Sequence, residues 1–594
     1  MAIKREDTDP KYRWRLEDIF ESDDAWNAEF REAEEGLKIL PSFRGKIAAS
    51  SDGMYEYFTK RAEETKKLER LYGYASMRRD ENTANTLYQG MTDKALKLIV
   101  TYESELAFAT PEMLTIPQEE LEKRAAEERF ADHRFELRKL ERSRAHILSE
   151  KEEKLLAMVQ EPLEGASSIF NMLNNVDLKF GEVTDAEGKK TELTHGTYSV
   201  LLKDPDRNVR KQAYEKLYGA YGSMKNTIST TYATSVKTDV FAAKARNFDG
   251  ALEAALYGNN VPVSVYEELI EAVHEKLPAL HKYISLRKEV LGLEQLEMYD
   301  LYTPLLPECN MSLDYEQAKV LVKDALKPLG ENYQKLLDKA YTEGWIDVYE
   351  NEGKRSGAYS NSVYGTHPYV LLNHQNDVDH ASTLAHELGH AMHTYHSMDA
   401  QPYETADYCI MVAEVASTVN EMLLTRYLVG KETDKKKKAY LLNDFLETVR
   451  ATCYRQTMFA EFELKVHRMC ESGEPLTVDS MSKVYKELNE LYYKGVHVDD
   501  NIAMEWMRIP HFYRAFYVYQ YATGICTALA LVNNILEKGE LDRYIAFLSS
   551  GGSDYPIKLL QNAGVDLTDK NTVLNALDTF EKTVDELAEL LKED

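Results

Sequence analysis

Apolar residues recur at three- and four-residue spacing over long stretches of this chain, and this periodicity limits the fold more than any other feature. Clear examples are residues 16–40, 119–130 and 265–292. Glu, Lys, Leu and Ala, which favour helices, are abundant, whereas the 594 residues include only 16 Pro and 28 Gly. The sequence therefore predicts a mainly α-helical protein.

Strand signals are confined to two places. Residues 174–194, NNVDLKFGEVTDAEGKKTELT, have the pattern of a hairpin that turns at DAEG. The segment YVLLN at 369–373 is a short β-prone run, which predicts a small sheet. Because 594 residues exceed one simple core, we place a domain boundary after the hairpin. A helical amino-terminal region, 1–195, is expected to precede a longer domain, 196–594.

Acidic residues outnumber basic residues by 100 to 72, which gives a formal net charge of −28. This balance argues against a nucleic acid or an anionic membrane as the partner. The lysine-rich run at 431–438 is predicted to be a solvated loop.

Three features bear on the compartment. No run of about 18 apolar residues is present, and the amino terminus lacks the apolar core of a signal peptide. The five cysteines are widely spaced without a CxxC pattern, so neither a disulfide framework nor a cysteine zinc site is indicated. We expect a protein of the cytoplasm, a reducing compartment.

The segment LAHELGHAMH carries the motif with the most evident chemistry. Asp377 or Asp379 is a suitable N-cap for a helix over this segment. His386 and His390 then lie at positions i and i+4 on one face, where both imidazoles can reach one ion, and their nitrogens suit Zn²⁺ at about 2.0 to 2.1 Å. Glu387 lies about 100° further round the helix, where its carboxylate can reach a water without binding the metal.

The alternative interpretation of the motif is an ordinary polar face of a solvated helix. A chance HExxH in a chain of this histidine content has a probability of roughly a few per cent. Seven of the 15 histidines fall between residues 367 and 396, a density that a solvated helix rarely shows. Apolar neighbours also mean that a histidine pair needs a partner to offset its desolvation. We therefore predict a zinc site.

Two further histidines follow on the same helix, but neither is placed to be a third ligand. His396 stands ten positions after His386, as in the pattern HExxHxxGxxH, yet His393 occupies the position of the turn glycine. If the helix continues, His396 lies about 15 Å along the axis from His386, and His393 lies about 10 Å from it. The third ligand is therefore expected from another helix.

Glu414 is the candidate from the next helical segment, 405–430. Its neighbours are small and apolar, namely Val412, Ala413, Val415 and Ala416. A charge among such residues is costly to bury unless something neutralises it, and Zn²⁺ would do so. An antiparallel helix pair would set Glu414 opposite the two histidines. Glu421, two turns further on, stays an alternative ligand, and the simplest alternative is that Glu414 is a surface glutamate.

The segment 507–530 gathers one histidine and four tyrosines within eleven residues: His511, Tyr513, Tyr517, Tyr519 and Tyr521. Tyrosines at helical spacing serve packing more often than catalysis. Beside a zinc site, however, phenolic hydroxyls and an imidazole can stabilise the oxyanion of a tetrahedral intermediate. Both interpretations stay open on the residues alone.

Taken together, these segments resemble oligoendopeptidase F, of the thimet-oligopeptidase family of zinc metallopeptidases. The most specific pieces are LAHELGHAMH, the VAEVAST that holds Glu414, HPYVLLN, RIPHFYRAFYVYQYATG and SSGGSDYPIKLLQNAGVDL. The resemblance runs over most of the chain, with residues 1–195 as an amino-terminal region of the oligopeptidase F type. It implies a mainly α, two-lobed, zincin-like fold with a deep central channel, and the predicted small sheet would lie beside the HExxH helix.

The resemblance also implies functional roles. One Zn²⁺ per chain would be held by the two motif histidines and Glu414. Endopeptidase action on short unstructured peptides is implied. In the family a histidine followed by tyrosines contacts the substrate and the transition state; here His511 and Tyr519 match best, with Tyr517 next.

The predicted reaction is hydrolysis of an internal peptide bond by a metal-activated water. Glu387 would take the proton of that water and later deliver it to the leaving amine. Residues near Gly357 to Tyr359 would hold the peptide main chain as an edge strand. Two alternatives stay open, a helical zinc carboxypeptidase and a catalytically silent peptide-binding protein. Short peptides are the expected partners, and the sequence indicates no oligomeric state.

Overall fold

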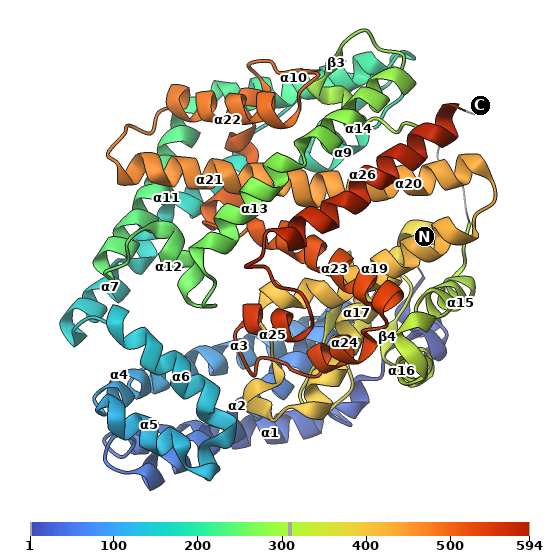
Figure 1. Cartoon of the computed structure of the whole chain (residues 1–594). Coiled ribbons are helices and arrows are strands. Elements are labelled where there is room, and N and C mark those ends of the chain that lie inside the picture. The colour runs from blue at the N-terminus through green and yellow to red at the C-terminus, as the bar shows by residue number, and fades with distance from the viewer. Residues whose placement is uncertain (1–2, 307–311, 593–594) are drawn as a thin grey trace. The chain divides into compact units, whose positions relative to one another are not determined.

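The computed structural model describes residues 3–306 and 312–592, and it is mostly helical (Figure 1), which confirms the predicted class. The chain divides into two compact units, each assembled from three segments. Unit 1 comprises Met1–Ala145, Asn310–Tyr427 and Leu531–Gly564, and unit 2 comprises His146–Cys309, Leu428–Ala530 and Val565–Asp594. The proposed sequence boundary at residue 195 stays a prediction, and so does the deep central channel.

Unit 1 carries the HExxH motif. Its helices are α1 (Asp23–Leu37), α2 (Ser51–Glu81), α3 (Thr86–Leu106), α4 (Ala109–Leu114), α5 (Gln118–Ala126), α6 (Arg134–Ser143), α15 (Tyr315–Ala325), α16 (Gly330–Thr342), α17 (Val378–Ala400), α18 (Tyr403–Ala406), most of α19 (Ile410–Lys431), α24 (Leu541–Leu548) and α25 (Pro556–Asn562). Its strands are β4 (Ile346–Asp347), β5 (Tyr359–Asn361) and β6 (Tyr369–Leu371).

Unit 2 carries the aromatic segment. Its helices are α7 (Glu150–Leu163), α8 (Gly165–Met172), α9 (His195–Leu201), α10 (Arg207–Ser223), α11 (Lys225–Ala245), α12 (Ala251–Tyr257), α13 (Val263–Glu275), α14 (Leu277–Val290), α20 (Lys435–Val449), α21 (Arg455–Glu471), α22 (Val478–Tyr492), most of α23 (Tyr519–Lys538) and α26 (Asn571–Lys592). Its strands are β1 (Glu182–Thr184), β2 (Lys190–Glu192), β3 (Leu296–Glu297) and β7 (Val496–His497).

Local signals explain where two of the predicted helical stretches begin or break. In the stretch 16–40, α1 starts only after Ser22, whose side chain accepts the N–H of Ala25 at 3.2 Å. The stretch 265–292 forms two helices, α13 and α14, because Pro278 has no N–H to donate and is tolerated only in the first turn of a new helix.

The lysine-rich run is only partly a loop. Helix α20 begins at Lys435 because the side chain of Asp434 accepts the N–H groups of Lys436 and Lys437, at 2.9 and 3.1 Å. An aspartate in this position is a strong N-cap. The prediction of a loop over 431–438 was therefore wrong for its second half.

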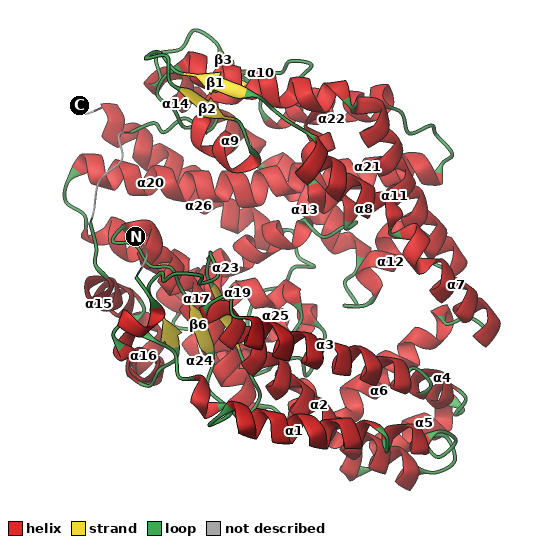
Figure 2. Cartoon of the chain, turned by 180° about the vertical axis from the view of Figure 1, so that it is seen from behind, coloured by secondary structure: helices red, strands yellow, loops and turns green. Residues whose placement is uncertain are grey.

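Both strand predictions are confirmed. β1 and β2 form an antiparallel hairpin, visible in Figure 2. The carboxylate of Asp185 holds its turn by accepting the N–H groups of Glu187 and Lys189, at 3.0 and 2.8 Å. The segment YVLLN supplies β6, the fully buried central strand of a sheet in the order β4-β6-β5. β4 runs parallel to β6 and β5 runs antiparallel to it, so β5 is an edge strand.

One hydrophobic cluster joins α2 to this sheet within unit 1. Leu71 and Tyr74 of α2 pack in the same buried cluster as Tyr369 and Leu371 of β6. The indole N–H of Trp26 donates to the carbonyl of Leu71 at 2.9 Å and fixes α1 against α2. The cluster therefore sets the position of α2 and β5, which both line the cavity described below.

No helix among residues 3–306 and 312–592 is both long and apolar enough to cross a membrane. Cys309 lies outside the described residues, and the other four cysteines are free thiols. Two of them, Cys453 and Cys526, are buried with their sulfur atoms 3.7 Å apart.

Candidate metal centre

Helix α17 holds the HExxH motif with one face in the core of unit 1. The side chain of Asp377 caps it by accepting the N–H of His380 at 2.8 Å, so the first of the two predicted caps is the one used. The core face consists of apolar residues, which include Ala381, Leu384, Ala385, Leu388, Ala391 and Met392. His386 and His390 lie one turn apart and are partly buried.

Helix α19 approaches α17 unusually closely because a glycine stands between them. A Cβ atom on Gly389 would lie 2.5 Å from the Cα of Ser417, closer than any side chain tolerates. The amide of Asn420 donates to the carbonyl of Ala385 at 3.0 Å, and its oxygen accepts the hydroxyl of Tyr333 at 3.0 Å. These contacts hold α19 at backbone distance from the motif.

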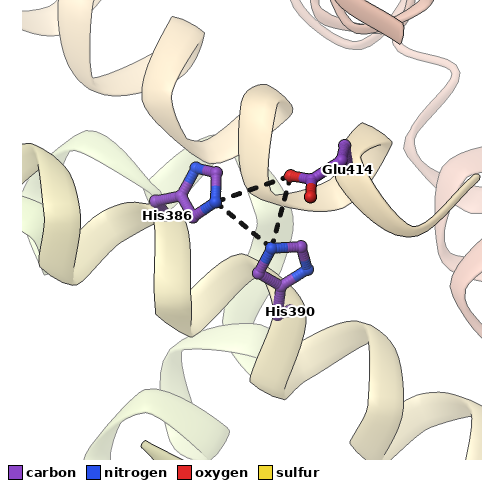
Figure 3. Close-up of side chains that lie close together, drawn as sticks. All are labelled: His386, His390 and Glu414. Carbon is purple, nitrogen blue, oxygen red and sulfur yellow. Dashed lines mark hydrogen bonds and ion pairs between the residues drawn. The ribbon is translucent and has the colours of Figure 1, made fainter. Parts of the chain in front are cut away.

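The close approach brings three candidate ligand atoms together (Figure 3). The Nε2 atoms of His386 and His390 lie 3.2 Å apart, and the Oε2 of Glu414 lies 3.6 Å from the first and 3.4 Å from the second. Ligands at about 2.0 to 2.2 Å from a tetrahedral zinc ion are separated by about 3.4 Å. The three atoms therefore fit a common ion, and within the described part of the chain no other group of three such residues does.

Two neighbouring side chains orient these ligands. The Oε1 of Glu421 lies 3.2 Å from the Nδ1 of His386. The proton of the imidazole is therefore held on Nδ1, and Nε2 is left free to bind a metal. Burial lowers the pKa of His386, but the hydrogen bond and charge of Glu421 outweigh it and raise that pKa. The hydroxyl of Ser417 donates to the Oε2 of Glu414 at 3.2 Å. Glu421, an alternative ligand on sequence grounds, thus lies behind a histidine.

Glu387 stands beside this group without joining it. The residue is buried, with 6% of its surface exposed, and its Oε2 has no hydrogen-bond partner among the described residues. Burial raises the pKa of this carboxyl. A carboxylate with one free oxygen and a raised pKa is suited to accept and return a proton near neutral pH.

Three other histidines of the 367–396 region pack against aromatic rings. His393 is buried and stacks on Tyr408 with the ring centres 3.8 Å apart, and burial lowers its pKa to about 3. His396 faces Tyr333, and the ring of His367 stacks on Trp345. Neither His393 nor His396 belongs to the ligand group.

A cavity of about 1200 Å³ opens beside the three ligand atoms, and all of its lining residues belong to unit 1. Its walls come from α2, α3, α6, α17, α18, the first turns of α19 and the edge strand β5. Tyr359, Ser360 and Asn361 of β5 line it, so the strand predicted to hold peptide main chain borders the cavity. Ligand pockets for small molecules are typically about 300 to 1000 Å³, so this cavity has room for several residues of a peptide.

The aromatic segment lies in unit 2, where exposure separates its tyrosines. His511 is exposed, and the rings of Tyr517 and Tyr521 lie 6.2 and 6.0 Å from it. Tyr519 is only 2% exposed and packs against Tyr266 with the ring centres 5.2 Å apart. Tyr517 and Tyr521 are therefore the partly exposed tyrosines whose rings lie next to His511.

A strained backbone shapes this segment. Phe516 has a φ of +56°, a conformation that non-glycine residues rarely adopt. Its N–H donates at 3.0 Å to the carboxyl of Glu463, which is fully buried in α21. Burial raises the pKa of Glu463 well above its usual range. The buried carboxyl and the core packing of Phe516 hold the turn that presents Tyr517.

Three contributions were not recognised in the sequence. Gly389 was available as the glycine inside the motif, and a glycine within a helix indicates close packing. The orienting role of Glu421 and the exposure of Tyr521 depend on which way neighbouring helices face, and no periodicity in the sequence reports that.

Comparison with known proteins points in one direction. The family model described as peptidase family M3 matches residues 200–579, and the one described as oligopeptidase F matches residues 112–180. The chain is 45% identical to oligopeptidase PepF of Bacillus subtilis over 593 residues, 99% of this chain and 88% of that protein. It is 38% identical to group B oligopeptidase PepB of Streptococcus agalactiae over 599 residues, 100% of this chain and 99% of that protein. The crystal structure of oligoendopeptidase F from Enterococcus faecium matches with a TM-score of 0.75 and 35% identity, over 96% of this chain and 100% of that chain.

Proposed function

From the premise that the chain belongs to peptidase family M3, we propose that it is a zinc endopeptidase that cleaves internal bonds of short unstructured peptides. Membership of the family makes the chain a metallopeptidase of oligopeptides, and the resemblance to oligoendopeptidase F is confirmed. The proposal adds the identity of the metal, the roles of single residues and the unstructured state of the substrate.

The observation that carries the proposal is the geometry of the ligand group. Two imidazole nitrogens and one carboxylate oxygen lie 3.2 to 3.6 Å apart on two packed helices. Two histidines and a glutamate form a known catalytic zinc set, which leaves a position open for water and substrate. The contact of Glu421 with Nδ1 of His386 leaves the Nε2 of that ring as an acceptor that faces His390 and Glu414, the protonation state that a metal ligand requires.

The protein's own groups then divide the work. When bound, the ion supplies a Lewis acid that polarises the scissile carbonyl and makes a water more acidic. Glu387 Oε2, free of other partners, accepts the proton of the attacking water and returns it to the leaving nitrogen. His386 and His390 would bind the ion through Nε2, and Glu421 holds the tautomer of His386 that allows this.

The substrate would bind along β5. Its edge position leaves main-chain groups unpaired on one side, and an extended peptide can add to them as a further strand. This mode reads the main chain of the peptide, so it requires an unstructured substrate and tolerates many side chains. The roles of His511, Tyr517 and Tyr519 in stabilising the oxyanion, and a place of action in the cytoplasm, remain predictions from the sequence.

The direct test uses purified protein and a quenched fluorescent peptide of about ten residues, blocked at both ends. We expect one zinc per chain, internal cleavage, and loss of activity with a chelator that zinc restores. Cleavage only of unblocked peptides from the carboxyl end would indicate a carboxypeptidase instead. Zinc binding without any cleavage would indicate a peptide-binding protein.

Replacing the proposed base separates metal binding from chemistry. Glu387→Gln should keep one zinc per chain and lower kcat by about 10²- to 10⁴-fold, the usual contribution of a general base. Zinc content measured by mass spectrometry of the metal checks the first part, and steady-state kinetics checks the second. A Glu387→Gln protein that cleaved at nearly the parental rate would refute the assignment.

A further inference from the structure

The cavity of unit 1 is charged in a way that the proposed reaction does not require. Glu387 lines it as a buried residue, 6% exposed, with a carboxylate oxygen that has no partner among the described residues. We propose that this cavity selects peptides that carry a positive charge, an ammonium or guanidinium group, close to the scissile bond. The inference rests on the proposed peptidase function and adds a substrate class to it.

The lining of the cavity is far more acidic than the chain. Apart from Glu387 and Glu414, five carboxylates line it, namely Glu69, Glu103, Glu136, Glu404 and Asp407. Arg61 is the one lysine or arginine in the described lining. The chain as a whole has 100 acidic residues for 72 basic residues, so its acidic composition does not account for a ratio of five to one.

The one guanidinium is already matched. Arg61 makes two parallel bonds to the carboxylate of Glu136, at 2.6 and 2.5 Å, and it also faces the rings of Tyr57 and Phe58. Two parallel bonds of this kind fix both partners. Arg61 is therefore unavailable to neutralise the remaining carboxylates or to hold the carboxyl end of a peptide.

A second cation compensates one more carboxylate in part. The ammonium of Lys66 lies over the rings of Tyr364 and Tyr403, 5.5 and 5.0 Å from their centres. Tyr403 donates a hydrogen bond to Glu69, and the N–H of Tyr364 donates to the same carboxylate at 2.7 Å. Burial raises the pKa of Glu69, and the negative charge of Asp407 raises it further.

Besides Glu69, three carboxylates of the lining have no ion pair among the described residues. Glu103 on α3, Glu404 on α18 and Asp407 make no salt bridge to any described residue. Asp407 has a local role, since it accepts the N–H of Tyr408 at 2.9 Å. Glu103 and Glu404 approach the cavity from two different helices, which makes them the residues to change.

The expected effect follows from the distances available in a cavity of this size. A peptide cation about 8 Å from a carboxylate, in a partly hydrated cavity, gains binding by about two- to fivefold for each carboxylate. A peptide with an anionic side chain in the same place binds more weakly by a similar factor. Because the attraction acts through water, added salt should weaken it.

The positive charge can come from a lysine or arginine side chain or from the free amino terminus of the peptide. Doubly blocked ten-residue peptides, each with Lys, Gln or Glu at one position and otherwise identical, isolate the side-chain source. The same Gln peptide with a free amino terminus isolates the other. We expect kcat/KM to fall in the order Lys, Gln, Glu by at least about 60-fold overall at low salt, and the difference to shrink at 0.5 M salt.

Variants locate the effect. The double variant Glu103→Gln, Glu404→Gln should reduce the Lys-to-Glu ratio of kcat/KM by about 16-fold or more, since each carboxylate changes that ratio by about fourfold or more. Glu119→Gln, which changes an exposed carboxylate of α5 in the same unit but outside the cavity, is the matched control and should keep the ratio. Zinc content, measured on each variant, confirms that the site is intact.

The outcomes separate the two proposals. If the zinc-loaded parent cleaves none of the peptides, the peptidase proposal itself fails. If it cleaves all of them with equal kcat/KM, or if the double variant keeps the full preference for Lys, only the charge selection is overturned. A preference confined to the free amino terminus would assign the carboxylates to end recognition.

Discussion

Two side chains behind the candidate ligands hold these ligands in position. Glu421 contacts the outer nitrogen of His386, and Ser417 donates to the carboxylate of Glu414. Such contacts fix the tautomer and the direction of a ligand before the ion arrives. The ligand group is therefore preorganised by residues that do not themselves bind the ion.

Replacing the orienting glutamate should weaken the site without removing it. Glu421→Gln is expected to lower zinc affinity by about 10- to 100-fold, because the amide holds the imidazole proton less firmly. Competition against a fluorescent zinc chelator measures this. A loss of all zinc, equal to that of Glu414→Ala, would show that Glu421 is itself a ligand, and an unchanged affinity would show that its contact has no effect.

Exposure distinguishes the two tyrosines assigned to the transition state. Tyr517→Phe should lower kcat by about 10²-fold with KM little changed, the usual cost of losing an oxyanion donor. Tyr519→Phe should change kcat by less than about threefold, because the side chain is 2% exposed and packs on Tyr266. The opposite ranking in steady-state kinetics would restore Tyr519, which matches the family pattern better on sequence.

The histidine cluster shows what residue-level prediction could and could not do. The i, i+4 pair of imidazoles was readable because helical geometry alone places the two rings together. The density of histidines was a weaker guide, since His367, His393 and His396 stack on aromatic rings. Stacking depends on partners from distant elements, and the sequence does not report them.

The distance between two helices is what makes the ligand group possible. α17 and α19 meet where Gly389 faces Ser417, and Asn420 ties the two backbones. Glu414 lies one turn before this contact, so the short distance between the two helices also sets the distance of its carboxylate from the histidines. The sequence predicted a return helix with Glu414 opposite the histidines, but the closeness of the pair depends on a glycine whose role was not recognised.

A methyl group at position 389 should force helices α17 and α19 apart. Gly389→Ala places a Cβ 2.5 Å from the Cα of Ser417, so the helices must separate or shift. We expect a loss of about 1 to 3 kcal/mol in the free energy of unfolding, together with weaker zinc binding because Glu414 moves. Chemical denaturation and chelator competition check the two effects.

Gly430→Ala is the matched control, because it lies on α19 with no atom within 4 Å of an added Cβ. It should leave zinc affinity unchanged. A Gly389→Ala protein that bound zinc as tightly as the parent would show that the spacing of the helices does not control the site.

At the scale of the whole molecule, a buried network of charged residues around Glu505 stabilises unit 2. In unit 2, Glu505 is buried and accepts bonds from Arg455 at 2.7 and 3.1 Å, from Arg508 at 3.0 Å and from Tyr485 at 2.6 Å. Burial alone would raise the pKa of Glu505, but the two guanidinium groups lower it to about 2. This network joins α21 and α22 to the segment that leads to His511.

The stability of unit 2 should therefore depend on pH. A carboxyl with a lowered pKa in the folded state stabilises the fold above its unfolded pKa, and that stability is lost as the pH falls from about 4.5 towards about 2. This lowering of the pKa of Glu505 corresponds to about 3 kcal/mol in the free energy of unfolding. Glu505→Gln should cost about 3 to 5 kcal/mol at pH 7, since it leaves two buried cations with less charge to balance them.

Hydrogen exchange of α21 and α22, followed between pH 7 and pH 3, measures this difference locally. The parent and Glu505→Gln should converge as the pH falls. Exposed Glu119→Gln serves as the control with no expected change. A constant difference at all pH values would mean that the charge of Glu505 does not stabilise the unit.

The division into units shows the limit of prediction at this scale. Helical class, the hairpin and the sheet strand followed from local patterns such as DAEG and YVLLN. The units did not, because each combines three segments that are far apart in sequence. Long-range packing of this kind leaves no period or composition change at its boundaries.

Zinc-edge anomalous scattering from crystals of the zinc-loaded protein tests the central claim most directly. We predict one strong peak per chain, within bonding distance of His386 Nε2, His390 Nε2 and a carboxylate oxygen of Glu414, with Glu387 close by but not bonded. A peak at any other set of residues, Glu387 or Glu421 bonded in place of Glu414, or no peak in an active sample would contradict it.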